Sequence, residues 1–318
     1  MKFLIIIFLL ISSMQYSFCQ NLSKKQIEEI THPIPNLISN NYVFDVKGAK
    51  ISAAFQKMVD SEKYLNYTNP DSLSNVLSRD LKEISNDGHM YVIVKKTSKD
   101  SNINKDWEEQ EKENEIKYNY GFPTVQILDK NIGYIRITEF MHPKRSMPTA
   151  IAAMKLVENT NKLIVDLRGN GGGYPGIMLY ILNHYFDGPP IHLSTTYFSN
   201  KNEVPHTTYT SDLVYGKLRV GTPLYVLIDG KTASASEYFA YTAQVFGKGI
   251  IIGEKSAGAA HMNEYFDLPY NFKISISTAA PIITKTNSNW ETVGVKPDYE
   301  VESGILKEKI IELINTIE

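Results

Sequence analysis

The pattern of apolar and polar positions predicts helices in the first part of the chain. Across residues 73–84, apolar side chains recur at the spacing that places them on one face of an α-helix. Asp71 and Ser72 are expected to cap the start of this helix, and residues 86–88 (Asn-Asp-Gly) to end it. The next residue, His89, stands where the pattern changes to that of a strand. We therefore expect a histidine on a turn between two elements.

The second part of the chain alternates between strand-like and helix-like patterns. Such alternation favours an α/β core with a largely parallel sheet. Strands are expected at residues 124–128, 132–137, 163–167, 224–228 and 250–252, and helices at residues 147–158, 174–186, 233–246 and 305–317.

A densely charged segment separates the two parts. Residues 95–118 contain almost no apolar side chains, so we expect a solvated linker there. We therefore predict a helical N-terminal domain over residues 20–94 that ends in the turn with His89, a charged linker over 95–118 and an α/β domain over 119–318.

The first residues have the pattern of a secretory signal peptide. The apolar run 3–11 is followed by a more polar stretch, so residues 1–19 are expected to be removed on export to a secreted or periplasmic location. This run is too short to cross a bilayer, which takes about 20 residues. A lipid anchor on Cys19 is the alternative, although Tyr16 and Phe18 fit a lipoprotein signal poorly. Cys19 is the chain's only cysteine, which excludes a catalytic cysteine in the mature protein.

Composition and charge agree with a globular protein and argue against a nucleic-acid binder. Of the 318 residues, 42% are apolar and 21% are charged, close to the globular average. The 33 basic and 35 acidic side chains give a formal net charge of −2, whereas nucleic-acid-binding domains are typically basic. We predict neither a nucleic-acid partner nor a membrane span.

A glycine-rich turn follows one of the predicted strands. Residues 162–173 (KLIVDLRGNGGG) lead from a strand into a turn ahead of a helix, where backbone N–H groups can face a ligand or an oxyanion. The dinucleotide-binding spacing GxGxxG fails because Tyr174 replaces its last glycine. A P-loop ending in residues 230–232 fails because Tyr225 replaces its first glycine. A tight turn without a ligand is the alternative.

Two serines are expected at the N-terminus of a helix. Residues 224–237 (LYVLIDGKTASASE) lead from a strand through Asp229 and Gly230 into a helix that begins near Ser234 and Ser236. The helix dipole and the free N–H groups there favour developing negative charge, so either hydroxyl could act as a nucleophile. The alternative is a capping role. The chain lacks the GxSxG elbow of α/β-hydrolases.

The histidines do not form a metal-binding pattern. All 7 are scattered, without HExxH or a close pair, so we predict no metal and no other cofactor. A serine nucleophile needs a base, which His89 could provide. Glu291 precedes a turn marked by glycine and proline, where a carboxylate could orient an imidazole.

In combination, these segments resemble the tail-specific (C-terminal processing) serine peptidase family, in the branch of the tricorn core and the interphotoreceptor retinoid-binding protein-like peptidases. The matching segments follow the family's order and are DGH (87–89), YGF with NIGYIRITEF (to 140), IVDLRGNGGG (164–173), TASASE (232–237), GEKSAGAAH (253–261) and ExxGVxPD (291–298). The resemblance implies a crotonase-like (ClpP/crotonase) α/β core behind a helical N-terminal domain.

The resemblance also implies roles for individual residues. Its nucleophile corresponds to Ser234, its general base to His89 and its supporting carboxylate to Glu291. The oxyanion hole would use the N–H groups of Ala235 and Gly172. His89 would take the Ser234 proton as the serine attacks a peptide carbonyl.

The chain departs from the larger Ser-Lys branch of this family. The lysine of that branch lies 25 residues after the nucleophile, where this chain has Ala259, so Lys255 could replace it only from a different geometry. That branch usually carries a PDZ domain, which residues 95–118 cannot hold, so we predict none.

The chain also departs from the tricorn core. Gly88 stands where a serine links the histidine to the glutamate, which leaves open whether Glu291 contacts His89. His261 lies 25 residues after Ser236 and is a second candidate base.

The leading prediction is an exported serine endopeptidase that cleaves peptides or unfolded protein segments. A non-catalytic binding protein for hydrophobic ligands or peptides on the same scaffold is the alternative, because vertebrate relatives in this branch carry hydrophobic ligands. An acyl-CoA enzyme on the related crotonase fold is a third hypothesis, which would explain only the two oxyanion amides.

Overall fold

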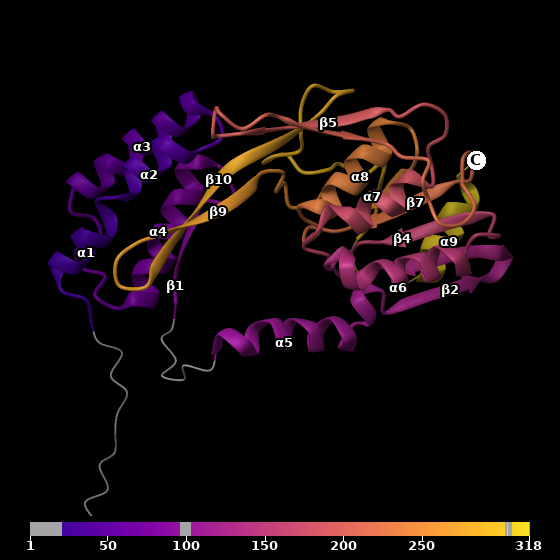
Figure 1. Cartoon of the computed structure of the whole chain (residues 1–318), viewed down its shortest axis with the longest axis horizontal. Helices are drawn as coiled ribbons and strands as arrows, with labels where there is room; N and C mark the ends of the chain where they lie inside the picture. Colours follow the sequence, from indigo (N-terminus) through magenta and orange to yellow (C-terminus); the bar gives the residue numbers. More distant parts are fainter. Residues whose placement is uncertain (1–20, 96–102, 303, 305–306, 318) are drawn as a thin grey trace, which may run out of the picture.

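The computed structural model describes residues 21–95, 103–302, 304 and 307–317 (Figure 1). The predicted signal peptide, residues 1–19, lies outside these described residues, as does Cys19. No helix in the described ranges is long and apolar enough to cross a membrane.

Four helices form the N-terminal part of the chain (Figure 1). They are α1 (Lys24–Thr31), α2 (Ile34–Asn41), α3 (Asp45–Asp60) and α4 (Pro70–Ser85). The predicted caps of α4 are corrected, because the side-chain oxygen of Asn69 accepts a hydrogen bond from Ser72 N at 3.0 Å and so caps the helix ahead of Asp71 and Ser72. The helix ends where expected, at Asn86 in the left-handed conformation.

Most of the predicted charged linker is a helix, α5 (Ile103–Lys117). Glutamate and lysine are good helix formers, so a polar segment can be helical without an apolar face. Near the end of α5, the buried Glu115 forms an ion pair with Arg145 of α6 (Pro143–Leu156), with Arg145 Nη2 at 2.8 Å from Glu115 Oε1. The end of α5 is thereby attached to the α/β part.

A six-stranded sheet forms the centre of the α/β part. Its order is β11-β8-β7-β4-β3-β2, and every pair is parallel except β2 with β3. This confirms the predicted α/β core with a largely parallel sheet. The strands are β2 (Thr124–Leu128), β3 (Ile132–Arg136), β4 (Lys162–Asp166), β7 (Leu224–Ile228), β8 (Ile250–Gly253) and β11 (Tyr299–Glu300).

Both faces of this sheet are covered, which explains why its strands are continuous apolar runs. On β7, Val226 and Ile228 belong to a core shared with α6, α7 (Pro175–Asn183) and α8 (Ala235–Val245). Tyr225 and Leu227 on the opposite face belong to a core shared with α9 (Lys307–Thr316).

A second, antiparallel sheet joins the N-terminal helices to the α/β part. Its order is β1-β10-β5-β6, and β9 also pairs with β10. β10 pairs with β1 at one end, where Ser275 lies opposite Tyr91, and with β5 at the other, where Ala280 lies opposite Tyr197. The strands are β1 (Tyr91–Val94), β5 (His192–Phe198), β6 (His206–Tyr209), β9 (Met262–Asp267) and β10 (Phe272–Ile283).

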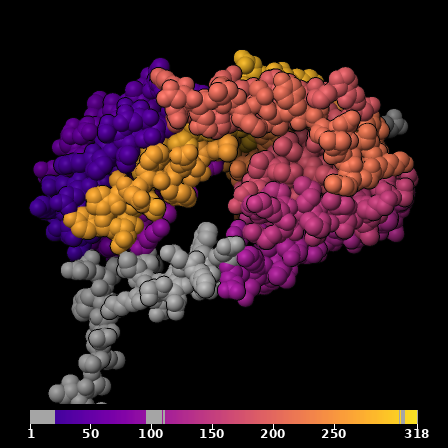
Figure 2. All heavy atoms as spheres, in the orientation of Figure 1, coloured from indigo at the N-terminus to yellow at the C-terminus, as the bar shows by residue number. Residues whose placement is uncertain are grey.

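The N-terminal helices share their apolar core with this second sheet. Ile27, Phe55 and Leu77 pack in one buried cluster with Phe272 and Ile276 of β10. β9 and β10 form an arm between the helices and the α/β part, and Figure 2 shows an opening beside this arm. The turn that follows α4 is therefore positioned by strands that come almost 200 residues later in the chain.

Candidate active site

Ser234 stands immediately before α8, at the end of the loop that leaves β7. Its backbone has φ 54° and ψ −121°, and a residue with a side chain pays a cost in strain to adopt such a conformation. Strain of this kind persists only where the surroundings hold it. The next residue, Ala235, contributes the first amide of the helix, where the dipole favours negative charge.

A buried glutamate holds the serine turn in place. Glu237, in the first turn of α8, is fully buried and accepts hydrogen bonds from Ser234 N (2.9 Å), Gly258 N (2.6 Å), Ala259 N (2.8 Å) and Ser256 Oγ (2.5 Å). Burial raises the pKa of Glu237, although these hydrogen bonds oppose the rise. Glu237 therefore ties the loop after β8 to the candidate nucleophile.

The glycine-rich turn after β4 lies against Ser234. Gly172 has φ +111°, and a β-carbon placed on it would lie 2.7 Å from Ser234 Cβ and 3.0 Å from Ala235 N. The Gly172 N–H, predicted as an oxyanion donor, donates here to Asn170 Oδ1 at 2.9 Å. The N–H of Gly173, which lines the adjoining cavity, has no hydrogen-bond acceptor among the described residues.

An apolar cavity of about 340 Å³ adjoins Ser234. None of its lining residues is Asp, Glu, Lys or Arg in the part of the chain that the structure describes. Ser194 Oγ and Tyr238 OH, two of its polar atoms, are hydrogen-bonded to each other at 2.8 Å. The cavity therefore suits a neutral, apolar side chain. Its apolar lining includes Met178, Leu179, Phe198, Tyr238 and Trp290.

His89 lies on the turn between α4 and β1, as the pattern predicts. Its side chain is 17% exposed, and its Nδ1 atom is 3.7 Å from Asp87 Oδ1. That Nδ1 atom forms no hydrogen bond with any described residue. The structure likewise has no hydrogen bond between His89 and Ser234, both of which it describes.

Asp87 is held between two histidines. Its Oδ1 atom accepts a hydrogen bond from His89 N at 2.9 Å, and its Oδ2 atom accepts from His261 Nδ1 at 2.8 Å and from Tyr42 OH at 2.9 Å. Burial alone would raise the pKa of Asp87, but the hydrogen bonds from His261 and His89 outweigh it and hold this pKa well below its usual range.

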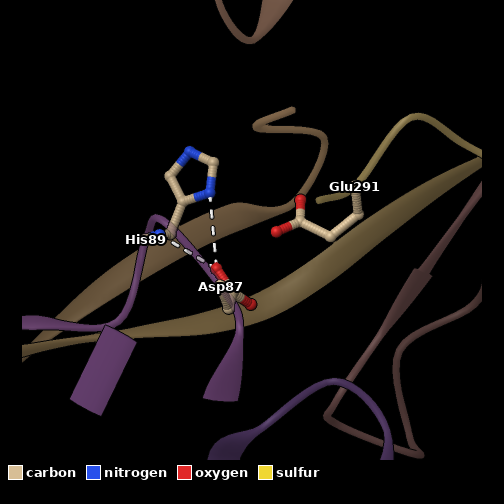
Figure 3. Close-up of side chains that lie close together, drawn as sticks. All are labelled: Asp87, His89 and Glu291. Atoms are coloured by element: carbon tan, nitrogen blue, oxygen red, sulfur yellow. Dashed lines mark hydrogen bonds and ion pairs between the residues drawn. The ribbon is translucent and has the colours of Figure 1, made fainter. Parts of the chain in front are cut away.

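Glu291 approaches the same place from the loop after β10. Its Oε2 atom accepts hydrogen bonds from Ala260 N (2.7 Å) and His261 N (2.9 Å), while its Oε1 atom has no partner among the described residues. Burial raises the pKa of Glu291 against the opposing effect of His261, and the charge of Asp87 adds to the rise. Figure 3 shows its carboxylate directed towards Asp87 and His89.

The three side chains in Figure 3 also form a group that could hold a metal ion. One potential ligand atom from each of Asp87, His89 and Glu291 lies within 4.8 Å of the others. Imidazole and carboxylate are ligands that Zn²⁺ accepts. The same arrangement also suits a base with carboxylate partners.

The three alternative candidates lie elsewhere or are already engaged. Ser236 is fully buried on α8, and its Oγ atom has no described partner. The His261 side chain is 3% exposed, with Nδ1 bound to Asp87. Lys255 is exposed in the loop after β8. None of the three lines the cavity beside Ser234, as far as the described residues define it.

Two residues of the site, Asp87 and Glu237, are not predicted as site residues from the sequence. An aspartate two positions before His89 is a pattern for a side-chain turn, and this could have indicated the bond to His89 N. No local pattern indicates that His261, 174 residues later, binds the same carboxylate.

Comparison with known families identifies the class of protein. Residues 131–301 match peptidase family S41, and residues 21–124 match the N-terminal domain of peptidase S41 in eukaryotic IRBP. The chain belongs to peptidase family S41. This confirms the resemblance on which the predicted site residues rest.

Individual relatives agree with this assignment. A carboxyl-terminal-processing protease from Picosynechococcus sp. is 27% identical over 191 residues, which are 56% of this chain and 42% of the relative, so the chain spans less than half of that protein's length. A putative peptidase from Parabacteroides merdae aligns over 92% of this chain and 93% of its own, with TM-score 0.61 and 21% identity. The photosystem II D1 C-terminal processing protease aligns over 91% and 96%, with TM-score 0.55 and 13% identity. These structures confirm the predicted fold.

Proposed function

We propose that the protein is an exported serine endopeptidase that cleaves peptides or unfolded protein segments. The observation that carries this proposal is the strained Ser234 at the start of α8, packed against Gly172 and beside an apolar cavity. A serine that only capped a helix would need neither this backbone strain nor the close approach of a glycine turn. Membership of a peptidase family supports the same reaction class.

In the proposed reaction, the Ser234 oxygen attacks the carbonyl carbon of the peptide bond while His89 Nε2 takes the hydroxyl proton. The carbonyl π electrons move to its oxygen, which the N–H of Ala235 and an amide of the Gly172–Gly173 turn stabilise. His89 then gives the proton to the leaving nitrogen as the C–N bond breaks. A water molecule hydrolyses the acyl-enzyme by the reverse order of proton transfers.

Two further features of the proposed reaction concern the support of His89 and the binding of the substrate. A carboxylate supports His89, a role that the resemblance assigns to Glu291, whose Oε1 atom has no partner among the described residues. The apolar cavity receives an uncharged side chain of the substrate next to the bond that is cut. The same cavity supports the alternative function, a binding protein for hydrophobic ligands, in which Ser234 would not react.

Covalent labelling with a fluorophosphonate probe distinguishes the two functions. We expect a label on Ser234, located by peptide mapping, and no label on that peptide in Ser234→Ala. His89→Ala should reduce the labelling rate roughly 10²–10⁴-fold, the usual contribution of a general base. Ser236→Ala is the matched control, because this serine is two residues away but buried outside the cavity. Peptide hydrolysis retained by Ser234→Ala would refute the peptidase proposal.

Export is proposed from the first residues of the chain, which resemble a signal peptide. Expression of the full chain in a bacterium should give a mature protein outside the cytoplasm that begins near Gln20. N-terminal sequencing of that protein measures this directly. An N-terminus at a lipid-modified Cys19 would indicate an anchored protein, and retention of Met1 would contradict export.

A further inference from the structure

One buried carboxylate, that of Asp87, connects three separate segments of the molecule. It accepts hydrogen bonds from Tyr42 OH, which follows α2, and from His261 Nδ1, which precedes β9. It also accepts from the backbone N–H of His89 on the turn after α4, and lies 3.7 Å from the ring atom His89 Nδ1. The Asp87 side chain is 0% exposed, so water does not compete strongly for these bonds.

His261 is fixed from several sides. Its backbone N–H donates to Glu291 Oε2 at 2.9 Å. Its ring packs edge-on against Phe44 and Tyr42, with ring centroids 5.7 Å and 6.3 Å away. With its Nδ1–H bound to Asp87 and its ring enclosed by aromatic side chains, His261 is better placed to hold Asp87 than to serve as a second base.

Asp87 and Glu291 compete for the role of carboxylate partner to His89. Asp87 Oδ1 lies 3.7 Å from His89 Nδ1, whereas no ion pair joins Glu291 to His89 among the described residues. The Oε2 atom of Glu291 is also occupied by two backbone N–H groups. The geometry therefore favours Asp87 as the carboxylate partner of His89.

We propose that Asp87 is a positioning residue that directs the Nδ1 proton of His89, and that His261 and Tyr42 hold Asp87 for this role. The proposal rests on the proposed function, in which His89 is the base. A carboxylate that accepts from Nδ1–H selects the tautomer whose Nε2 atom is free to take a proton. The role that the resemblance implies for Glu291 therefore passes to Asp87.

Asp87→Asn is the variant that tests the proposal. It keeps the size of the side chain but removes the charge, so we expect the labelling rate constant of Ser234 to fall roughly 10²–10⁴-fold, with probe affinity unchanged. ¹⁵N NMR should show a smaller Nδ1–H tautomer population for His89. Asp80→Asn is the matched control, because Asp80 is 1% exposed and accepts from Tyr64 OH at 3.1 Å in the same helical part, without a histidine. It should label at the wild-type rate.

The ¹⁵N NMR tautomer population of His89 is the readout that a purely structural role of Asp87 would not change.

Milder variants test whether Tyr42 and His261 hold Asp87 in position. They also test the proposal if Asp87→Asn does not fold. Tyr42→Phe should slow labelling a few-fold, whereas its control Tyr64→Phe should not. His261→Asn keeps a donor near Asp87 and should therefore label faster than His261→Ala.

The outcomes separate this inference from the proposed function. Wild-type labelling in Asp87→Asn, together with loss of labelling in Glu291→Gln, would overturn the inference and return the orienting role to Glu291. Absence of labelling in the wild-type protein would instead refute the proposed function. The NMR measurement then still decides the inference, because an unchanged His89 tautomer in Asp87→Asn contradicts it.

Discussion

The two halves of the candidate site are built differently. The serine half comprises Ser234, Ala235, Glu237 and the Gly172 turn. It lies within the α/β part, on the loops that follow the neighbouring strands β4 and β7 and on the first turn of α8. The base half brings together Asp87, His89, His261 and Glu291 from the turn after α4 and from loops next to β9 and β10. The serine half therefore depends on one core. The base half depends on how the N-terminal helices pack against the second sheet.

The strongest test of whether the two halves are held separately is a substitution that adds a methyl group within the serine half. Gly172→Ala places a β-carbon 2.7 Å from Ser234 Cβ at a backbone φ of +111°, so the turn must move away from the nucleophile. We expect the labelling rate of Ser234 to fall on the order of 10²–10³-fold, the cost of losing an oxyanion donor. ¹⁵N NMR of His89 should show no change, because the base half is held by other contacts.

Gly171→Ala is the matched control for this experiment. A β-carbon on Gly171 meets no atom within 4 Å, so the neighbouring substitution should leave the labelling rate close to that of the wild type. If Gly172→Ala altered the His89 signals as strongly as it altered labelling, the two halves would not be independent.

The same difference explains how far the fold could be predicted. Strands such as β4 and β7 are buried on both faces, so each is a continuous apolar run that the sequence pattern identifies. Strands of the second sheet mix polar and apolar residues, as in His192–Phe198 (HLSTTYF). Their pairing joins distant segments, for example Tyr91 with Ser275. Local patterns do not contain this information, so the sequence predicts only the first strand of this sheet, the one that follows His89.

The site shows the same division. Local sequence predicts a serine at the start of a helix and a glycine-rich turn after a buried strand. The two lie together because the strands before them are parallel neighbours in the sheet. That Asp87 binds His261 follows only from the packing of two distant segments. The sequence context identifies Glu291 as a candidate. It does not predict that the Glu291 carboxylate accepts a hydrogen bond from the backbone N–H of His261.

Acid titration tests the difference between the two halves through two buried carboxylates, Asp87 in the base half and Glu237 in the serine half. The pKa of Asp87 is lowered in the folded protein, so its contribution to stability is complete above its unfolded value of about 3.9 and is lost as the pH falls below it. The pKa of Glu237 is raised, so folding favours its protonated form. Its contribution is complete below its unfolded value of about 4.3 and is lost as the pH rises.

The two carboxylates should therefore respond to acid in opposite directions. The free energy of unfolding, measured by urea titration between pH 7 and pH 3, should differ between wild type and Asp87→Asn by an amount that shrinks below about pH 4. The wild type should gain stability relative to Glu237→Gln as the pH falls towards about 4. We expect both changes to be about 1–3 kcal/mol. Asp80 and Asp166 also have lowered pKa values, but they are common to all three proteins and cancel in each difference. If both differences shrank together on acidification, the two carboxylates would share one electrostatic environment, and the division of the site into two separately held halves would be wrong.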